Sequence, residues 1–200
     1  MKDLAKKTGR PRTFDEDAAL ERAMDVFWEK GYEGASLPEL TEAMGMNRPS
    51  LYSVFGNKEA LFLKALERYT ANRGQLFERA LEQPSARAVV ETYLMGNADG
   101  QTESDHPHGC LVINGALACS DDAKPVRDAL IERRSVTEAK LRERLRKARD
   151  DGDLPADCCA AQLARYVMTV SNGMAVQAAA GATRAQLHEV VQLVLRGFPT

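Results

Sequence analysis

The chain has 200 residues, 44% of them hydrophobic and 28% charged, and its net charge of −2 gives no support for nucleic-acid binding. No apolar run approaches the roughly 20 residues that span a bilayer, and no apolar stretch follows the basic first residues as it would in a signal peptide. We therefore expect a cytoplasmic protein without membrane partners, whose four cysteines are thiols rather than a disulfide framework.

Residues 1–12 form a basic arm, although the chain as a whole is slightly acidic. A single acid, Asp3, stands against five basic residues, which are Lys2, Lys6, Lys7, Arg10 and Arg12. A basic arm beside a folded domain can approach phosphates, and Arg10 and Arg12 are candidates for contacts in a minor groove. By itself the arm is equally consistent with a solvated tail.

The elements that follow have helical periodicity, and no strand pattern of period two persists, so we predict an all-α fold. Thr13 and Glu16 have capping-box spacing at the start of a helix predicted over 15–30. Gly31 is expected to end this helix. Its apolar face is formed by Leu20, Ala23, Met24 and Phe27.

Two short helices are predicted next, over 37–44 and 48–54, with a tight turn between them at Gly45. A second capping box, Ser36-Leu37-Pro38-Glu39, opens the first of them. Asn47 is expected to cap the second.

The remainder of the chain is also predicted to be helical. Asn57 caps a long helix through about Leu81, and Thr183 with Gln186 forms a capping box for the last helix. A polar segment rich in turn formers predicts a loop over 97–108. The other helices are expected over 85–97, 110–118, 122–150, 157–180 and 184–196, which makes nine in all.

The two short helices have the arrangement of a helix-turn-helix, whose second helix enters the major groove with its N-terminal residues at base edges. Arg48 is long enough to bind guanine in bidentate fashion. Tyr52 and Lys58 are expected to bind phosphates, as is the helix N-terminus at Ser36. The remaining candidates for DNA contacts on the second helix are Asn47, Pro49, Ser50 and Ser53. A plain three-helix bundle is the structural alternative.

Segment 14–61 closely resembles the DNA-binding region of the tetracycline-repressor (TetR) family. The matching residues are Phe27-x-x-x-Gly31-Tyr32-x-x-Ala35-Ser36, Ala43-Met44-Gly45 and Ser50-Leu51-Tyr52-x-x-Phe55-Gly56-Asn57-Lys58-Glu59-Ala60-Leu61, and the preceding Gly9-Arg10-Pro11-Arg12 is also common in that family. The sequence departs from the family at Leu40-Thr41, where Ile-Ala is usual. Leu40 keeps the core role, and Thr41 can contact a phosphate.

The resemblance implies a nine-helix regulator that usually represses transcription, binds a palindromic double-stranded operator as a homodimer, and is released by a small ligand. We expect no cofactor. The expected domains are the basic arm over 1–12, a helix-turn-helix domain over 13–58, and a helical regulatory and dimerisation domain over 59–200. The operator sequence, the effector and the target genes do not follow from the sequence.

The last two helices are more apolar than one buried face requires, and the resemblance favours a symmetric dimer over packing within the chain. The positions that indicate this are Val167, Val170, Met174, Ala175 and Ala178 on the first, and Leu187, Val190, Val191, Val194 and Leu195 on the second.

A ligand pocket is expected inside helices four to eight. Its candidate lining residues are Phe62, Tyr69, Phe77, Tyr93, Met95, Cys110, Ile113, Asn114, Leu117, Tyr166, Asn172 and Met174. For any single aromatic residue or methionine, ordinary core packing is the alternative. No chemical class of ligand follows from this set.

Cys110 lies in a Gly-Cys-Leu stretch similar to one found in many members of the family, some of which use a cysteine there to sense electrophiles or oxidants. A helix N-terminus at Cys110, with His106 and His108 nearby, favours a thiolate. Cys110 is therefore a candidate redox residue, and the alternative is a small buried apolar side chain. The remaining cysteines, Cys119, Cys158 and Cys159, are less favourably placed.

Other functions have weaker support. His106-x-His108 is a poor metal signal, because the only other histidine is the distant His188, and we expect no metal site. No nucleophile triad, phosphate-binding loop or pair of carboxylates stands out, so an enzyme is a distant alternative. A protein-interaction module built on the three-helix domain is another.

Overall fold

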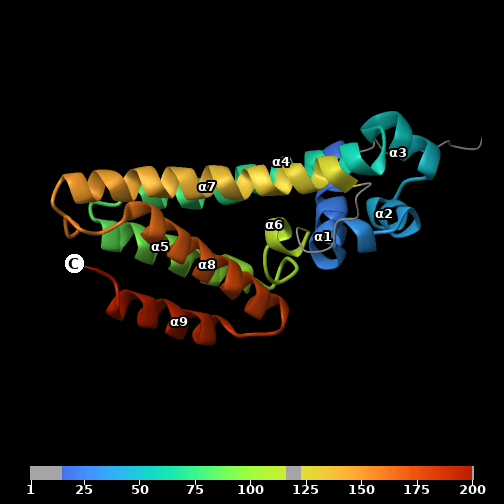
Figure 1. Ribbon diagram of the computed structural model, residues 1–200. Helices are drawn as coiled ribbons and strands as arrows, with labels where there is room; N and C mark the ends of the chain where they lie inside the picture. The colour runs from blue at the N-terminus through green and yellow to red at the C-terminus, as the bar shows by residue number, and fades with distance from the viewer. Residues whose placement is uncertain (1–14, 116–122, 200) are drawn as a thin grey trace, which may run out of the picture.

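The computed structural model describes residues 15–115 and 123–199. All regular structure within these ranges is helical. The helices are α1 (Glu16–Gly34), α2 (Leu37–Met44), α3 (Arg48–Phe55), α4 (Lys58–Leu81), α5 (Ala86–Gln101), α6 (Leu111–Asn114), α7 (Lys124–Asp150), α8 (Ala160–Ala179) and α9 (Arg184–Arg196). Figure 1 shows α1, α2 and α3 at one end of an elongated molecule, α4 and α7 running along its length, and α5, α8 and α9 packed below them.

Local capping interactions begin α2, α3, α4 and α9 where the sequence predicts. The Ser36 and Thr183 capping boxes are both present, and the side chains of Asn47 and Asn57 cap α3 and α4. The box predicted for α1 is wrong. The side chain of Asp15 accepts the backbone N–H of Ala18 at 3.0 Å and is the N-cap, whereas Thr13 lies outside the described residues.

Gly31 does not end α1 as predicted. The backbone there takes φ 70° and ψ 175°, which glycine adopts without a side-chain clash, and helical structure resumes to Gly34 after this kink. The Gly31 Cα also faces the carbonyl of Asn114, since a Cβ built at this position would lie 3.6 Å from that oxygen. The kink therefore brings the end of α1 against α6.

The loop predicted over 97–108 begins too early, because α5 continues to Gln101. Asn97 donates to the Ser171 hydroxyl at 3.2 Å, and Gln101 donates to the Ser171 carbonyl at 3.4 Å. These polar residues are helical because α8 supplies their partners. α6 covers Leu111–Asn114 of the predicted 110–118 and has Gly115 as its C-cap, and residues 116–122 lie outside the described ranges.

The buried side chains form two clusters. One is built by α5, α8 and α9 with the second halves of α4 and α7. The other joins α1, α2 and α3 to the first half of α4, to α6, and to Val126 and Leu130 of α7. Phe27 of α1 packs edge-on against Phe62 of α4, with ring centroids 5.0 Å apart. The second core thus crosses the domain boundary expected between residues 58 and 59, so α1 is packed directly on the larger helical domain.

Among the helices that the structure describes, none has the length and hydropathy to cross a membrane.

Candidate functional site

The turn between α2 and α3 holds these two short helices in a fixed geometry. Gly45 ends α2 in the left-handed region, with φ 66° and ψ 34°, where a residue with a Cβ is strained. Leu40 and Met44 of α2 and Leu51 and Phe55 of α3 are buried against the rest of the second core. One face of α3 is therefore anchored, and the other is left to solvent.

The outer face of α3 carries most of the residues expected to contact bases. Ser50 is half-buried, and the exposed residues are Asn47, Arg48, Pro49, Tyr52 and Ser53. The side-chain Oδ1 of Asn47 already accepts the backbone N–H of Ser50 at 2.9 Å, so its side-chain Nδ2 is the group left to donate to a base. Arg48 is the one long cationic side chain of this helix.

Lys58 lies at the start of α4, close to the end of α3. Its ammonium is 4.6 Å from the centroid of the Tyr32 ring, a cation–π arrangement that aims the side chain. Burial lowers the pKa of Lys58, and the nearby Glu33 carboxylate opposes that shift. A phosphate at this position would offset the cost of removing the ammonium from water.

Two other predicted phosphate contacts have competing partners. The Glu39 carboxylate accepts the backbone N–H of Ser36 at 3.0 Å and the Ser36 hydroxyl at 2.6 Å, and it also pairs with Lys30. An anion therefore already occupies the N-terminus of α2. The Thr41 hydroxyl donates its proton to the carbonyls of Leu37 and Pro38. It therefore has no proton left to donate to a phosphate oxygen, which can only accept a hydrogen bond.

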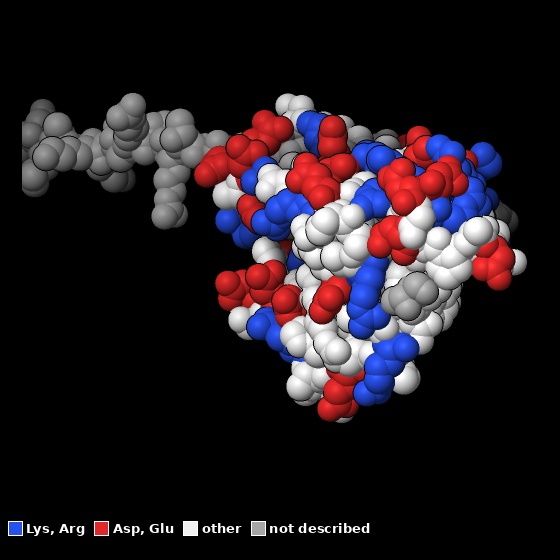
Figure 2. Space-filling view, turned by 90° about the vertical axis from the view of Figure 1, so that its left-hand side faces the viewer, with Lys and Arg blue, Asp and Glu red and all other residues white. Residues whose placement is uncertain are grey.

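Arg10 and Arg12 lie outside the described residues. The end of the molecule away from α2 and α3 has no concentration of positive charge in its described part, because Figure 2 shows acidic and basic side chains interspersed there.

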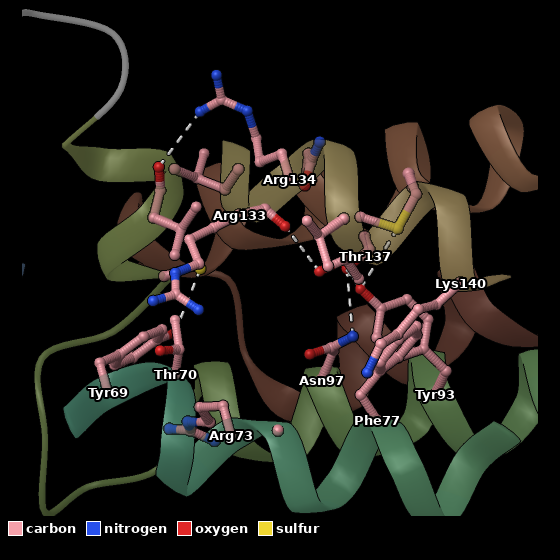
Figure 3. Close-up of a pocket in the computed structure, with 18 of the residues that line it drawn as sticks. Tyr69, Thr70, Arg73, Phe77, Tyr93, Asn97, Arg133, Arg134, Thr137 and Lys140 are labelled. Carbon is pink, nitrogen blue, oxygen red and sulfur yellow. Dashed lines mark hydrogen bonds between the residues drawn. The ribbon is translucent and has the colours of Figure 1, made fainter. Parts of the chain in front are cut away.

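A cavity of about 280 Å³ lies between α4, α5, α6, α7 and α8 (Figure 3). Six of the residues predicted to line a ligand pocket do line it, and they are Tyr69, Phe77, Tyr93, Cys110, Ile113 and Asn172. They come from four helices and the N-cap of α6, and only the packing of these elements brings them together.

The other predicted lining residues lie elsewhere. Phe62 is in the core beside Phe27, Met174 is buried in the first cluster, and Met95 packs at the edge of that cluster. The Asn114 amide donates to the Trp28 carbonyl at 3.2 Å. Tyr166 is 49% exposed on the outside of α8. Leu117 lies outside the described residues.

Sequence reasoning missed the charged lining of the cavity, which consists of Arg73, Glu78, Arg133, Arg134 and Lys140. Composition alone places such residues in solvent, and Glu78, Arg133 and Lys140 are indeed exposed at the open side of the cavity, whereas Arg73 and Arg134 are half-buried. A signal was present for Arg73, because it lies four residues after Tyr69 and four before Phe77, on the face of α4 that these aromatics share. The Gln101 side chain, 6% exposed, also lines the cavity, and its carbonyl oxygen has no hydrogen-bond partner among the described residues.

Cys110 lies in the cavity wall next to Tyr69, whose hydroxyl donates to its sulfur at 3.2 Å. Burial, together with the nearby Cys110, raises the pKa of Tyr69 well above its usual value, so the hydroxyl keeps its proton. The two histidines that were expected to favour a thiolate at Cys110 have other surroundings. His106 Nδ1 lies 3.2 Å from the Asp25 carboxylate, and His108 is exposed.

The cavity wall contacts the DNA-binding end of the molecule at Trp28 of α1. The Trp28 ring packs edge-on against Tyr69 at 4.9 Å and is stacked with His106 at 5.7 Å, both between ring centroids. The guanidinium of Arg73 lies 5.5 Å from the centroid of the Trp28 ring. A change at Tyr69 or Arg73 thus reaches α1 without an intermediate residue.

The apolar residues that indicated dimerisation are mostly buried within the chain. Of those ten, only Val190 is exposed and Val170 half-buried. The large apolar side chains that α8 and α9 do expose are Tyr166, Val176, Val190 and Leu193. Leu193, which is not among the ten, is 63% exposed.

No group of three or more histidine, cysteine or acidic side chains in the described ranges is arranged to bind a metal ion.

Comparison with known proteins gives matches over both parts of the chain. Residues 19–65 match the family model "Bacterial regulatory proteins, tetR family", and residues 86–194 match "Tetracyclin repressor-like, C-terminal domain". The HTH-type transcriptional repressor ComR of Escherichia coli strain K12 is 35% identical over 98% of this chain and 94% of its own length.

Solved structures agree with this result. A cysteine mutant of the TetR family regulator CifR, in complex with a 26-bp double-strand operator DNA, is 46% identical with a TM-score of 0.89, covering 95% of this chain and 100% of that chain. The TetR family regulator PfmR of Thermus thermophilus is 25% identical with a TM-score of 0.70, covering 94% of this chain and 100% of that chain.

Proposed function

The chain belongs to the TetR family of DNA-binding transcriptional regulators, and we propose that within this family it is a homodimeric repressor of a palindromic operator, released when a small molecule occupies the cavity. Members of this family are regulators and not enzymes. The name of ComR and the operator complex of CifR support repression and operator binding.

The observation that carries the proposal is the contact between cavity and DNA-binding domain at Trp28. Tyr69 and Arg73 line the cavity and also contact the Trp28 ring. A ligand that favours one arrangement of these side chains favours one position of α1 and hence of α3. Release is then a shift of population toward a conformation in which two α3 helices no longer match successive major grooves.

The dimer is proposed to form through the exposed face of α8 and α9. Tyr166, Val176, Val190 and Leu193 are large apolar side chains left in water on these two helices. A two-fold interface would bury the same patch on both protomers. The two α3 helices would then face half-sites about one helical turn of DNA apart.

The test is operator binding by the full chain. Random double-stranded fragments are selected on the immobilised protein, and the enriched sequence is assayed by fluorescence anisotropy at several salt concentrations. We expect a palindromic site, two chains per site, and an affinity that falls steeply with salt because counterions are released from the phosphates. Enrichment of no common sequence, or binding that is insensitive to salt, would contradict the proposal and favour a protein-interaction module.

A second candidate is a repressor that senses electrophiles or oxidants through Cys110. Its support is the placement of the Cys110 sulfur in the cavity wall, with the Tyr69 hydroxyl at hydrogen-bond distance. A reagent that enters the cavity would meet this thiol, and modification would disturb Tyr69 and through it Trp28. The two candidates differ in whether release reverses on dilution of the small molecule.

A further inference from the structure

The cavity has an excess of positive charge at the end nearest α1 and α6. Its lining includes Arg73, Arg133, Arg134 and Lys140 against a single acid, Glu78. At the other end the Lys140 ammonium and the Glu78 carboxylate form an ion pair at 2.5 Å, and these charges largely offset each other. Arg73, Arg133 and Arg134 therefore make the electrostatic potential positive at the end of the cavity beside Tyr69 and Thr70.

Arg133 is the arginine with the most capacity to bind a ligand. Figure 3 shows its side chain descending from α7 across the cavity toward Tyr69 and Thr70 of α4. Within the described residues its guanidinium has no hydrogen-bond or ion-pair partner. Five N–H donors are therefore available in a planar fork, the arrangement that matches the two oxygens of a carboxylate.

Arg73 lies across the cavity from Arg133 and is only partly paired. It donates to the Gly100 carbonyl at 2.8 Å, and its nearest carboxylate oxygen, on Glu103, is 3.7 Å away. Arg134 turns outward and donates to the Val112 carbonyl at 3.4 Å (Figure 3). An anion between Arg133 and Arg73 would thus receive donors from two helices.

The rest of the cavity suits the uncharged body of a small molecule. Phe77, Ile113, Val136 and Met168 provide apolar surface. Burial raises the pKa of Tyr93, which stays protonated and donates to the Met168 sulfur at 3.6 Å. The volume of about 280 Å³ is at the lower end of the range of roughly 300–1,000 Å³ for ligand pockets, which favours a compact compound.

We propose that the effector of this protein is a small organic carboxylate, with its carboxylate held between Arg133 and Arg73 and its apolar body directed toward Phe77 and Met168. This inference rests on the proposed function, because it names the chemical class of the molecule that fills the same cavity. The carboxylate would compete with the Gly100 carbonyl for Arg73, and Arg73 also contacts Trp28. A neutral amide of the same shape offers one acceptor oxygen and no negative charge, so it cannot form the bidentate, charge-assisted hydrogen bonds that a carboxylate forms with a guanidinium group.

The experiment uses Trp28 as the reporter, because it is the single tryptophan of the chain and lies against Arg73. Benzoate and hexanoate are titrated against the operator-free dimer, each beside its neutral counterpart, benzamide or hexanamide. We expect a saturable change in Trp28 fluorescence with at least one acid, and binding at least about tenfold weaker for its amide. The Arg133→Gln variant should lose about tenfold or more in affinity for the acid. Arg142→Gln, the same substitution at an exposed position of α7 outside the cavity, should not.

Three results would overturn the carboxylate assignment. They are an amide that binds as tightly as its acid, undiminished acid binding by Arg133→Gln, and the failure of both acids to bind at millimolar concentration. Circular dichroism and thermal melting establish that each variant is folded. A neutral compound that releases operator DNA would leave the proposed function standing and remove only this inference, whereas a protein that selects no operator would remove the proposed function.

Discussion

The guanidinium carbon of Arg73 lies 5.5 Å from the centroid of the Trp28 ring, so a cavity-lining side chain of α4 contacts a buried side chain of α1. Trp28 is 1% exposed and belongs to the core that also anchors α2 and α3. Any ligand that moves Arg73 therefore acts on the same packed unit that positions the DNA-reading helix, and interfaces of this kind shift between discrete packings rather than deform continuously.

Gly100→Ala should displace Arg73 from Trp28. A Cβ at this position would lie 1.7 Å from the Arg73 Nη1 atom, so the guanidinium must leave the Gly100 carbonyl and its place beside the indole ring. We expect altered Trp28 fluorescence in the ligand-free protein. Gly74→Ala is the control, since nothing lies within 4 Å of its Cβ and a helical alanine stabilises by roughly 0.5–1 kcal/mol. Identical emission spectra for Gly100→Ala and the unmodified protein would refute the displacement.

Arg48→Ala and Lys58→Ala should weaken DNA binding in different ways. Arg48 is exposed at the N-terminal end of α3, so its loss should cost about 1–3 kcal/mol on the operator and relax base preference at one position of each half-site. We propose that Lys58, whose ammonium lies over the Tyr32 ring, binds a phosphate, so its loss should weaken binding to all sequences and reduce the salt slope by about 1 per protomer. Competition assays with single-base operator variants measure both effects. An unchanged base preference in Arg48→Ala would remove this residue from the base contacts.

Leu193→Arg should convert the proposed dimer to a monomer. Leu193 is 63% exposed on α9. In a symmetric apolar interface each protomer would contribute one arginine, so two guanidinium groups would be buried without an ion-pair partner. Sedimentation equilibrium measures the dissociation constant, and operator affinity should fall with it because one half-site contact is lost. Ile131→Arg, at a 44% exposed position of α7, is the matched control and should remain dimeric. A fully dimeric Leu193→Arg would exclude this residue from the interface.

The Glu39 carboxylate should make stability depend on pH only in acid. Hydrogen bonds from Lys30 and from Ser36 lower the pKa of Glu39 to about 2, against a usual value of 4.5. Since the folded-state pKa is depressed, its stabilising contribution is complete above pH 4.5, declines as the pH falls below that value, and is lost as the pH falls through about 2. Urea unfolding of the unmodified chain and of Glu39→Gln should differ by a constant amount from about pH 5 to neutral pH, where Lys30 remains charged, and converge on acidification. A difference that grows toward low pH would have the wrong sign.

The cysteines should react in a defined order and with different consequences. Burial raises the pKa of Cys158, with Asp157 and Cys159 adding to the shift, so its thiolate is scarce at neutral pH. Mass spectrometry should find exposed Cys159 alkylated by iodoacetamide before Cys158.

If the protein senses electrophiles, Cys110→Ser should abolish the release of operator DNA by the electrophile, and Cys159→Ser should leave that release intact. Release that persists in Cys110→Ser would eliminate the thiol mechanism.

Features that depend on neighbouring residues follow from the sequence alone. The Ser36 and Thr183 capping boxes, the Asn47 and Asn57 caps and the Gly45 turn need only side chains a few positions apart, and all are present. The motifs within segment 14–61 also carried the resemblance to the family, and the apolar faces indicated nine helices. Even locally the prediction was wrong at the start of α1, where Asp15 and not Thr13 with Glu16 supplies the cap.

Which distant residues meet depends instead on how the helices pack. Asn97 and Gln101 are helical because Ser171 on α8 supplies their partners. Arg73 and Arg133 line a cavity because α4 and α7 pack side by side, and no periodicity within one helix shows that two arginines face the same space. The residues expected at a dimer interface are mostly buried in the chain, and Leu193 is exposed instead, because the contact of α9 with α5 determines which of its two apolar faces is covered.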